Sequence, residues 1–234
     1  MEANQNIRTL SVDVGGSGVK VMVLDINGNP LTKKLRLQTP QPASKKLVID
    51  AILKLAEIAG EFERVSVGFP GVVRNGITGN AINLHPDWMG FDLATALSLL
   101  LKKPVRVIND ADMQGLAAIS GKGVELVITL GTGFGSALFV DGKLFPNLEM
   151  GHHPFRKGQT YEEQLGRAAL EKIGDEIWNQ RLEIAIELLE KLFNYDYLYI
   201  GGGEAKNITF ELPSNAQIIP NINGLLGGIK LWTT

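Results

Sequence analysis

The sequence predicts an α/β protein of two lobes around a central cleft, because the same succession of elements begins twice along the chain. Residues 7–14 alternate apolar and polar side chains and predict a strand, which Gly15 and Gly16 interrupt. Residues 126–130 predict another strand, and Gly131-Thr132-Gly133 follows it in the same way. Strands also alternate with helices along the chain, a pattern that favours parallel strands within a sheet.

The first half continues from its glycine turn into further strands and helices. Asn27-Gly28-Asn29-Pro30 has the composition of a turn between two strands. Leu47, Ala51, Leu55 and Ile58 recur at helical spacing. The predicted strands are 7–14, 19–26, 31–37, 65–69 and 105–108, and the predicted helices are 43–61, 91–101 and 111–119.

The second half repeats this order and ends in a short helix. The segment 175–194 carries Leu182, Ile186, Leu189 and Phe193 on one helical face. The predicted strands are 126–130, 134–140 and 197–200, and the predicted helices are 160–173, 175–194 and 222–231. We therefore expect a smaller lobe of residues 1–110, a larger lobe of residues 111–221, and a segment 222–234 that crosses back to the first lobe.

The composition argues against several classes of protein. The 234 residues carry a net charge of −2, with Lys and Arg scattered along the chain, which does not indicate a nucleic-acid binder. There is no cysteine, which excludes disulfides and thiolate metal sites. No apolar run approaches the roughly 20 residues that span a bilayer, and the amino terminus lacks the layout of a secretory signal. We expect a cytoplasmic protein with no membrane or nucleic-acid partner.

The two glycine turns indicate sites for a polyanion. In the first, Gly15, Gly16, Ser17 and Gly18 let the backbone approach a phosphate closely and expose N–H groups to it. Asp13, at the end of the preceding strand, is placed to hold Mg²⁺, often through water. Gly131, Thr132, Gly133 and Gly135 repeat this layout one lobe later. Each turn alone also fits an ordinary hairpin, but a polyphosphate chain gripped from both walls of a cleft requires two.

Asn109 and Asp110 stand where a predicted strand passes into a helix, the usual place for ligands in α/β sheets. Transfer of a phosphoryl group to an alcohol requires a positioned base, a metal and charge stabilisation. Asp110 is a candidate for this base, and Asn109 for a hydrogen bond to a neighbouring hydroxyl. Both residue types are also common helix N-caps, so the two flanking glycine turns decide the interpretation.

Glu149 and His152 form a fourth motif, Glu149-Met150-Gly151-His152-His153. A carboxylate and an imidazole close together can bind adjacent hydroxyls of a sugar. Without cysteine or a clear third ligand, a metal site at the two histidines is disfavoured, and His153 fits an ordinary loop residue.

Together these motifs resemble those of the ROK family of sugar kinases, within the actin-like ATPase superfamily. The resemblance runs from Asp13 to Gly228 and includes Asn109-Asp110-Ala111 as the catalytic signature. It is strongest for the polyphosphate glucokinases, which share the Gly-Gly-Ser-Gly turn and lack the zinc-binding cysteine cluster of many ROK members. It implies the two-lobed actin-like (ribonuclease H-like) fold with a central cleft, Asp110 as general base, Mg²⁺ as cofactor and no structural zinc.

The resemblance also assigns binding residues. The implied sugar ligands are Asn83, Asn109, Asp110, Glu149, His152 and Glu162, with Leu84 and Trp88 shaping the sugar loop and Glu163 as an alternative to Glu162. The implied phosphate and nucleotide ligands are Asp13, Gly15, Gly16, Ser17, Gly18, Lys20, Gly131, Thr132, Gly133, Gly201, Gly202 and Gly203. The segment that follows Gly203 is shorter than in the family, which weakens the expectation of tight nucleotide binding.

The resulting hypothesis is a kinase that moves a phosphoryl group from polyphosphate, ATP or both to the 6-hydroxyl of glucose or a related hexose. Other acceptors stay open: an N-acetylated amino sugar, mannose or fructose. A second class, a non-catalytic sugar-binding regulator, is disfavoured because Asp110 is retained. Lys122, Arg156, Lys157, Arg167 and Lys206 are candidates for a polyphosphate groove, or for an ordinary solvated surface. Dimers are common in the family, so a homodimer is a further expectation.

Overall fold

The chain forms two compact units, each with its own mixed sheet and core. The computed structural model describes residues 7–233. One unit comprises Met1–Ala117 with Ile222–Thr234, and the other comprises Ala118–Asn221. The C-terminal segment therefore belongs with the first unit. The sequence placed the boundary after residue 110, whereas the structure places it after Ala117, because helix α3 (Asp110–Leu116) packs on the first sheet.

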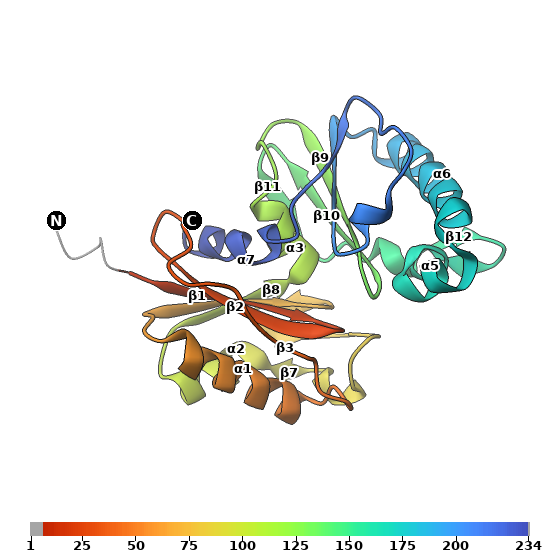
Figure 1. Cartoon of the computed structure of the whole chain (residues 1–234). Coiled ribbons are helices and arrows are strands. Elements are labelled where there is room, and N and C mark those ends of the chain that lie inside the picture. Colours follow the sequence, from red (N-terminus) through yellow and green to blue (C-terminus); the bar gives the residue numbers. More distant parts are fainter. Residues whose placement is uncertain (1–6, 234) are drawn as a thin grey trace. The chain divides into compact units, whose positions relative to one another are not determined.

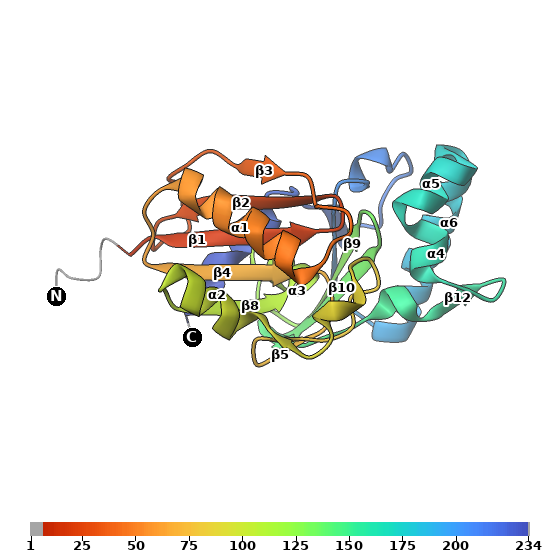
Figure 2. The ribbon, with the colours of Figure 1, turned by 90° about the horizontal axis from the view of Figure 1, so that it is seen from below.

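The first unit is built on a five-stranded sheet in the order β3-β2-β1-β4-β8. β1, β2 and β3 pair antiparallel, while β1, β4 and β8 pair parallel. Figures 1 and 2 show α1 and α2 on one face of this sheet, and Figure 1 shows α3 and α7 on the other. The strands are β1 (Thr9–Gly15), β2 (Gly18–Leu24), β3 (Leu35–Leu37), β4 (Arg64–Phe69) and β8 (Val105–Asn109). The helices are α1 (Lys45–Ala59), α2 (Leu93–Leu101), α3 (Asp110–Leu116) and α7 (Asn223–Leu226), the last continued by the 3-10 helix η4 (Gly227–Trp232).

Both faces of β1 are buried. Its apolar residues face the core under α1, and the residues between them face the C-terminal segment. Leu10, Val12 and Val14 lie in the core that α1 covers. On the opposite face the Ser11 hydroxyl donates to the Leu225 carbonyl at 2.5 Å. The Ser66 hydroxyl of β4 donates to the Gly228 carbonyl at 2.6 Å. These buried hydroxyls satisfy carbonyl groups at the carboxyl end of the chain and dock that segment on the sheet.

The second unit repeats this topology, in the order β11-β10-β9-β14-β15. A core of Leu126, Ile128, Trp178, Leu182 and Leu189 lies between this sheet and helix α6. The strands are β9 (Val124–Leu130), β10 (Phe134–Val140), β11 (Lys143–Phe145), β14 (Tyr197–Gly201) and β15 (Ala216–Ile218). The helices are α4 (Tyr161–Leu165), α5 (Arg167–Ile173) and α6 (Asp175–Phe193).

Shorter elements connect these frames. In the first unit they are β5 (Val73–Arg74), β6 (Ile77–Thr78), β7 (Phe91–Asp92) and the 3-10 helix η1 (Pro86–Trp88). In the second they are β12 (Pro154–Arg156), β13 (Gln159–Thr160) and the 3-10 helices η2 (Met150–His152) and η3 (Ala205–Asn207). Among residues 7–233, no helix combines the length and apolar character needed to cross a bilayer.

The helix predicted over 160–173 is two helices in the structure. Gly166, at ψ 167°, is extended and separates α4 from α5. A Cβ at this position would lie 2.9 Å from the Thr132 carbonyl oxygen, so the break brings the chain against the second glycine turn. The predicted terminal helix 222–231 likewise divides into α7 and η4.

Candidate active site

The first glycine turn closes the β1–β2 hairpin and carries an ion pair on its strands. Gly15 and Gly18 are paired residues, so Gly16 and Ser17 form the turn. Asp13 and Lys20 face each other across the same pair of strands, and Lys20 Nζ lies 2.7 Å from Asp13 Oδ2. The hairpin therefore brings a carboxylate, an ammonium group and the backbone of the turn together, and binding of phosphate there stays a prediction.

Asn109 acts as the N-cap of α3. Its Oδ1 accepts hydrogen bonds from the backbone N–H groups of Ala111 at 2.8 Å and Asp112 at 3.1 Å. Its Nδ2 donates to the Gly71 carbonyl at 3.2 Å, and the side chain is buried. Both ends of the amide thus hold the start of α3, and a bond from Asn109 to a sugar hydroxyl stays a prediction.

Asp110 is the first residue of α3 and is half-buried. Its Oδ1 accepts from the Ala111 N–H at 2.8 Å. The helix start lies close to β4, since a Cβ on Gly68 would come within 3.3 Å of the Asp110 Cα. Gly68 therefore determines how near α3 sits to the sheet, a role that the sequence analysis did not assign to it.

The predicted sugar loop is joined to this helix start through Gly71. A Cβ on Gly71 would overlap the carbonyl oxygen of Asn80, so the loop packs directly on the residue that Asn109 binds. Trp88 is buried, and its Nε1 donates to the Ala43 carbonyl at 2.9 Å. Asn83 itself is exposed on the loop. Trp88 thus anchors the loop to the segment that precedes α1, and a role of the loop in binding sugar stays a prediction.

Three polar side chains predicted to bind sugar gather beside the second glycine turn. His152 Nε2 lies 3.4 Å from Glu149 Oε2. Phe134 is the first residue of β10 after the turn, and its backbone N–H donates to Glu162 Oε2 at 3.2 Å. A Cβ on Gly151 would overlap the Phe134 carbonyl oxygen, which explains the glycine between Glu149 and His152.

The environment of Glu149 is unfavourable to its negative charge. Burial raises the pKa of this carboxyl group, the nearby Glu162 raises it further, and His152 acts in the opposite direction. Two carboxylates and an imidazole in one partly buried cluster form a set of acceptors and donors suited to hydroxyl groups.

The structure distinguishes Glu162 from its neighbour Glu163. Glu163 forms a capping box with Thr160: its Oε2 accepts from the Thr160 N–H at 2.8 Å, and its own N–H donates to the Thr160 hydroxyl. Glu163 is therefore engaged at the start of α4, and Glu162 is the carboxylate beside Glu149. His153 bonds the Pro154 carbonyl through Nδ1 and is exposed, as expected of a loop residue.

Gly201, Gly202 and Gly203 follow β14 next to the second glycine turn. Gly202 has a φ of 87°, and a Cβ there would overlap the carbonyl oxygen of Leu130, so only glycine fits. The Arg167 N–H donates to the Gly131 carbonyl at 2.9 Å, and its side chain pairs with Glu204 at 2.6 Å. No local pattern in the sequence predicts this pair, which engages Arg167, a candidate for the polyphosphate groove.

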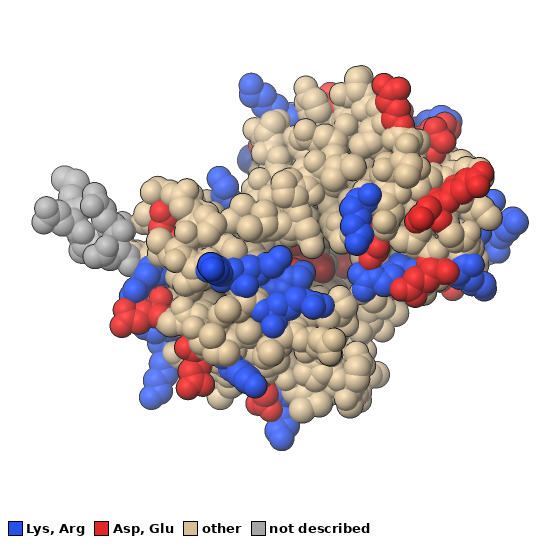
Figure 3. All heavy atoms as spheres, viewed as in Figure 1, with Lys and Arg blue, Asp and Glu red and all other residues tan. Residues whose placement is uncertain are grey.

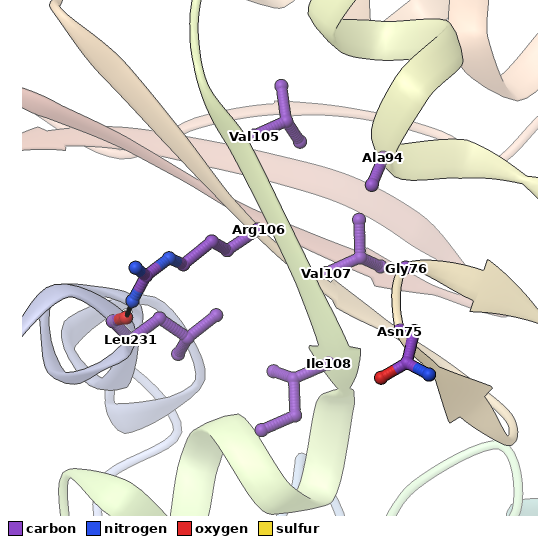
Figure 4. A pocket seen from close by; sticks show the side chains of 8 residues that line it. All are labelled: Asn75, Gly76, Ala94, Val105, Arg106, Val107, Ile108 and Leu231. Atoms are coloured by element: carbon purple, nitrogen blue, oxygen red, sulfur yellow. Dashed lines mark hydrogen bonds between the residues drawn. The ribbon is translucent and has the colours of Figure 1, made fainter. Parts of the chain in front are cut away.

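A pocket of about 330 Å³ lies at the outer edge of β8 and contains none of the predicted site residues (Figure 4). Arg106, which lines it, donates to the Leu231 carbonyl and stacks 4.4 Å from the Trp232 ring. Arg64 lies over the same ring at 4.9 Å. These contacts hold the C-terminal segment against the edge strand. The pocket lining is Asn75, Gly76, Ala94, Val105, Arg106, Val107, Ile108 and Leu231.

Comparison with known proteins gives a consistent result. The sequence model of the ROK family matches residues 9–165. A polyphosphate glucokinase of Mycobacterium tuberculosis (strain ATCC 25618 / H37Rv) is 33% identical over 92% of this chain and 88% of its own length. The crystal structure of the inorganic polyphosphate/ATP-glucomannokinase from Arthrobacter sp. strain KM superposes with a TM-score of 0.88, at 33% identity over 97% of this chain and 98% of that one. A ROK family glucokinase from Streptomyces griseus, in complex with glucose and AMPPNP, shares the fold at a TM-score of 0.78 and 20% identity, over 96% of this chain and 98% of that one.

Proposed function

Because the chain belongs to the ROK family and is a sugar kinase with the actin-like ATPase fold, we propose that it phosphorylates the 6-hydroxyl of glucose or a related hexose, with Asp110 as general base. The donor in this proposal is inorganic polyphosphate, ATP or both. The observation that carries it is the position of Asp110 at the start of α3, where the Asn109 cap and Gly68 define the path of the backbone.

In the proposed reaction Asp110 accepts the proton of the sugar hydroxyl. The hydroxyl oxygen then forms its bond to the terminal phosphorus of the donor, and the bond from that phosphorus to the bridging oxygen breaks, leaving the shortened donor with the electron pair. Such transfer depends mainly on positioning and charge stabilisation, with a modest contribution from the base. Sugar ligands in the proposal are Asn83, Asn109, Glu149, His152 and Glu162.

The donor in this proposal lies against the backbone of the first glycine turn. Lys20, beside the first turn, supplies positive charge, and Asp13 fits a role toward Mg²⁺. Lys20 Nζ donates to Asp13 Oδ2 at 2.7 Å. Mg²⁺ usually binds one or two carboxylates, several waters and the donor phosphates, so a single carboxylate oxygen suits it. When bound, the ion would neutralise charge on the phosphates. No cluster of three or more His, Asp or Glu suited to a metal occurs in the described part of the chain.

Two relatives support polyphosphate as a donor. The mycobacterial relative is named a polyphosphate glucokinase, and the Arthrobacter enzyme is named for both polyphosphate and ATP. From Gly203 to Asn221 the chain forms η3 and β15 and no α-helix. Glu204 and Arg167 pair at the beginning of this segment. A short connection of this kind offers little surface to an adenosine group.

The decisive test of the base is Asp110→Asn, with glucose as acceptor and polyphosphate or ATP as donor. We expect kcat to fall by about 2–4 orders of magnitude while glucose binding, followed by calorimetry, changes little. Asp50→Asn, at an exposed position of α1, is the matched control and should retain full activity. Near wild-type turnover in Asp110→Asn would show that another group takes the proton.

The acceptor and donor are tested together by a panel of hexoses against both donors. Glucose, mannose, fructose and an N-acetylated amino sugar are each combined with ATP and with polyphosphate, and consumption of the sugar is measured. We expect the highest kcat/KM with glucose. Silence in every combination would contradict the kinase proposal for this chain.

A further inference from the structure

Three charged side chains lie in a row across three strands of the first sheet. Asp13 of β1 is directly opposite Lys20 of β2, and Lys20 is directly opposite Arg36 of β3. Residues that are opposite each other point to the same face of a sheet. Two cations in direct opposition destabilise a sheet unless another charge compensates them. Asp13 compensates Lys20 at 2.7 Å, but Arg36 has no such partner among residues 7–233.

Arg36 extends its guanidinium group over the first glycine turn. Nη2 donates to the Ser17 carbonyl at 2.9 Å. A Cβ on Gly18 would lie 2.5 Å from Nε and 3.0 Å from Cζ of Arg36, so glycine at this position leaves the space that the guanidinium occupies. Arg36 therefore contacts the turn that we propose to bind the donor phosphate, although it is remote from that turn in sequence.

The guanidinium of Arg36 retains most of its capacity to bind an anion. An arginine has five N–H donors, and the bond to Ser17 uses one of them. No carboxylate lies within ion-pairing distance of Arg36 among residues 7–233. The side chain is exposed, as is the turn residue Ser17. An exposed and unpaired arginine with a fixed contact on a phosphate-binding turn suits a second phosphate group.

Two lysines extend this positive charge along the chain. Lys33 and Lys34 immediately precede β3, and both are exposed without an ion pair in the described part of the chain. Figure 3 shows Lys and Arg side chains gathered over β2 and β3 on the face of the first unit that this view presents. Lys34 lies two residues and Lys33 three residues before Arg36, so at most about 10 Å of extended chain separates these cations.

We propose that Arg36, with Lys33 and Lys34, binds the inner phosphate groups of a linear polyphosphate whose terminal phosphate lies at the first glycine turn. This inference rests on the proposed kinase function and specifies its donor. Polyphosphate carries a negative charge at each successive phosphate, whereas ATP ends in an adenosine that carries none. Additional cations close to the turn therefore favour the longer polyanion, and Arg36 is a specificity-determining residue for it.

The test is Arg36→Gln, assayed with long-chain polyphosphate, tripolyphosphate and ATP at saturating glucose. We expect kcat/KM for long-chain polyphosphate to fall about tenfold to a hundredfold, mainly through a higher KM. A loss of this size corresponds to one or two charge-assisted hydrogen bonds. The loss with ATP should stay below about threefold. The double variant Lys33→Gln/Lys34→Gln should raise the KM for long-chain polyphosphate more than the KM for tripolyphosphate. In the wild type, the KM for long-chain polyphosphate should rise steeply with salt concentration.

Two controls separate recognition of the donor from effects on folding. Lys54→Gln removes one positive charge from the exposed side of α1 and should leave kcat/KM unchanged for both donors. Arg36→Lys retains the charge without the planar fork and should recover part of the polyphosphate activity. Melting temperatures of the variants should not fall below that of the wild type, because each substituted side chain is exposed.

The outcomes also separate this inference from the kinase proposal. An equal loss with ATP and polyphosphate, or no loss with either, would overturn the role of Arg36 while leaving the kinase function intact. If the wild-type chain transfers phosphate from no donor, the kinase proposal fails. In that case calorimetric titration with long-chain polyphosphate decides the inference, which is contradicted if wild type and Arg36→Gln bind equally.

Discussion

Gly227→Ala should destabilise the first unit, although helix propensity alone predicts a gain. Gly227 has φ −63° and ψ −22°, a conformation that alanine adopts readily. A Cβ at this position, however, would overlap the Met113 carbonyl oxygen of α3 and lie 2.8 Å from its carbonyl carbon. The added Cβ is bonded directly to the backbone and meets a backbone carbonyl group, so no side-chain rotation can relieve the overlap. The C-terminal segment must move away from α3.

The cost follows from what this segment buries. Leu225 is 1% exposed and Ile229 is 4% exposed, and they pack with Met22 and Leu24 of β2. Burying one such side chain contributes about 1.5–3 kcal/mol. Displacing both therefore costs about 3–6 kcal/mol, whereas overpacking that local shifts relieve costs only about 1–3 kcal/mol. Because the overlap involves rigid backbone, we expect a loss of at least about 3 kcal/mol.

The assay is thermal unfolding followed by circular dichroism. For a chain of this size, a loss of about 3 kcal/mol corresponds to a fall in Tm of roughly 6–12 °C. Lys230→Ala, an exposed position in the same segment, is the control and should change stability by less than about 0.5 kcal/mol. A Tm of Gly227→Ala within 1–2 °C of wild type, roughly the shift that about 0.5 kcal/mol produces, would refute the argument that this contact is tight and rigid.

Two further predictions concern one half-buried and one buried carboxylate of the second unit. Burial raises the pKa of Glu149, so the stability this group contributes is present at low pH and lost as pH rises through its folded pKa; Glu149→Gln should raise Tm at pH 8, leave it nearly unchanged at pH 4, and weaken glucose binding in calorimetry. Burial acts to raise the pKa of Glu125 as well, but hydrogen bonds from Ser120, Tyr199 and other donors outweigh it and hold the pKa below its usual range. The stability contributed by Glu125 is therefore present at neutral pH and lost as pH falls through the folded pKa; Glu125→Gln should cost about 1–3 kcal/mol in urea unfolding at pH 7, with a smaller difference near pH 3, and equal costs at both values would contradict this.

Local sequence patterns were sufficient where a strand meets a glycine turn. The β1–β2 and β9–β10 hairpins and the start of α3 lie where alternation and turn residues predicted them. In each case the decisive preference is local, because glycine permits the turn and Asn109 caps the next helix. The polar residues beside these points, including Asp13 and Asp110, could therefore be assigned to an edge of the sheet before any coordinates were known.

Features that depend on distant contacts were not predictable in this way. Gly166 divides a stretch of helix formers because it packs on Thr132, which lies far from it in sequence. From its sequence context Arg167 is indistinguishable from a solvated surface cation, yet in the structure it forms an ion pair with Glu204. Arg36 gave no signal at all, since its place on the Gly18 turn arises from the pairing of β2 with β3. Propensity and spacing carry no information on such pairings.

Asn109 and Asp110 were each open to two explanations, an ordinary start of a helix and a catalytic role, and in the structure the two are compatible. Asn109 is an ordinary N-cap by its hydrogen bonds, and this is the reason that Asp110 has a defined position, since the cap fixes the first turn of α3 and the bond to Gly71 fixes the cap. The carboxylate of Asp110 is oriented in turn by the Ala111 N–H. A base must be held within a few tenths of an ångström of its working position. The Asn109 cap and the close contact with Gly68 supply that constraint. The contacts that explain Asn109 as an N-cap are therefore also those that the proposed catalytic role of Asp110 requires.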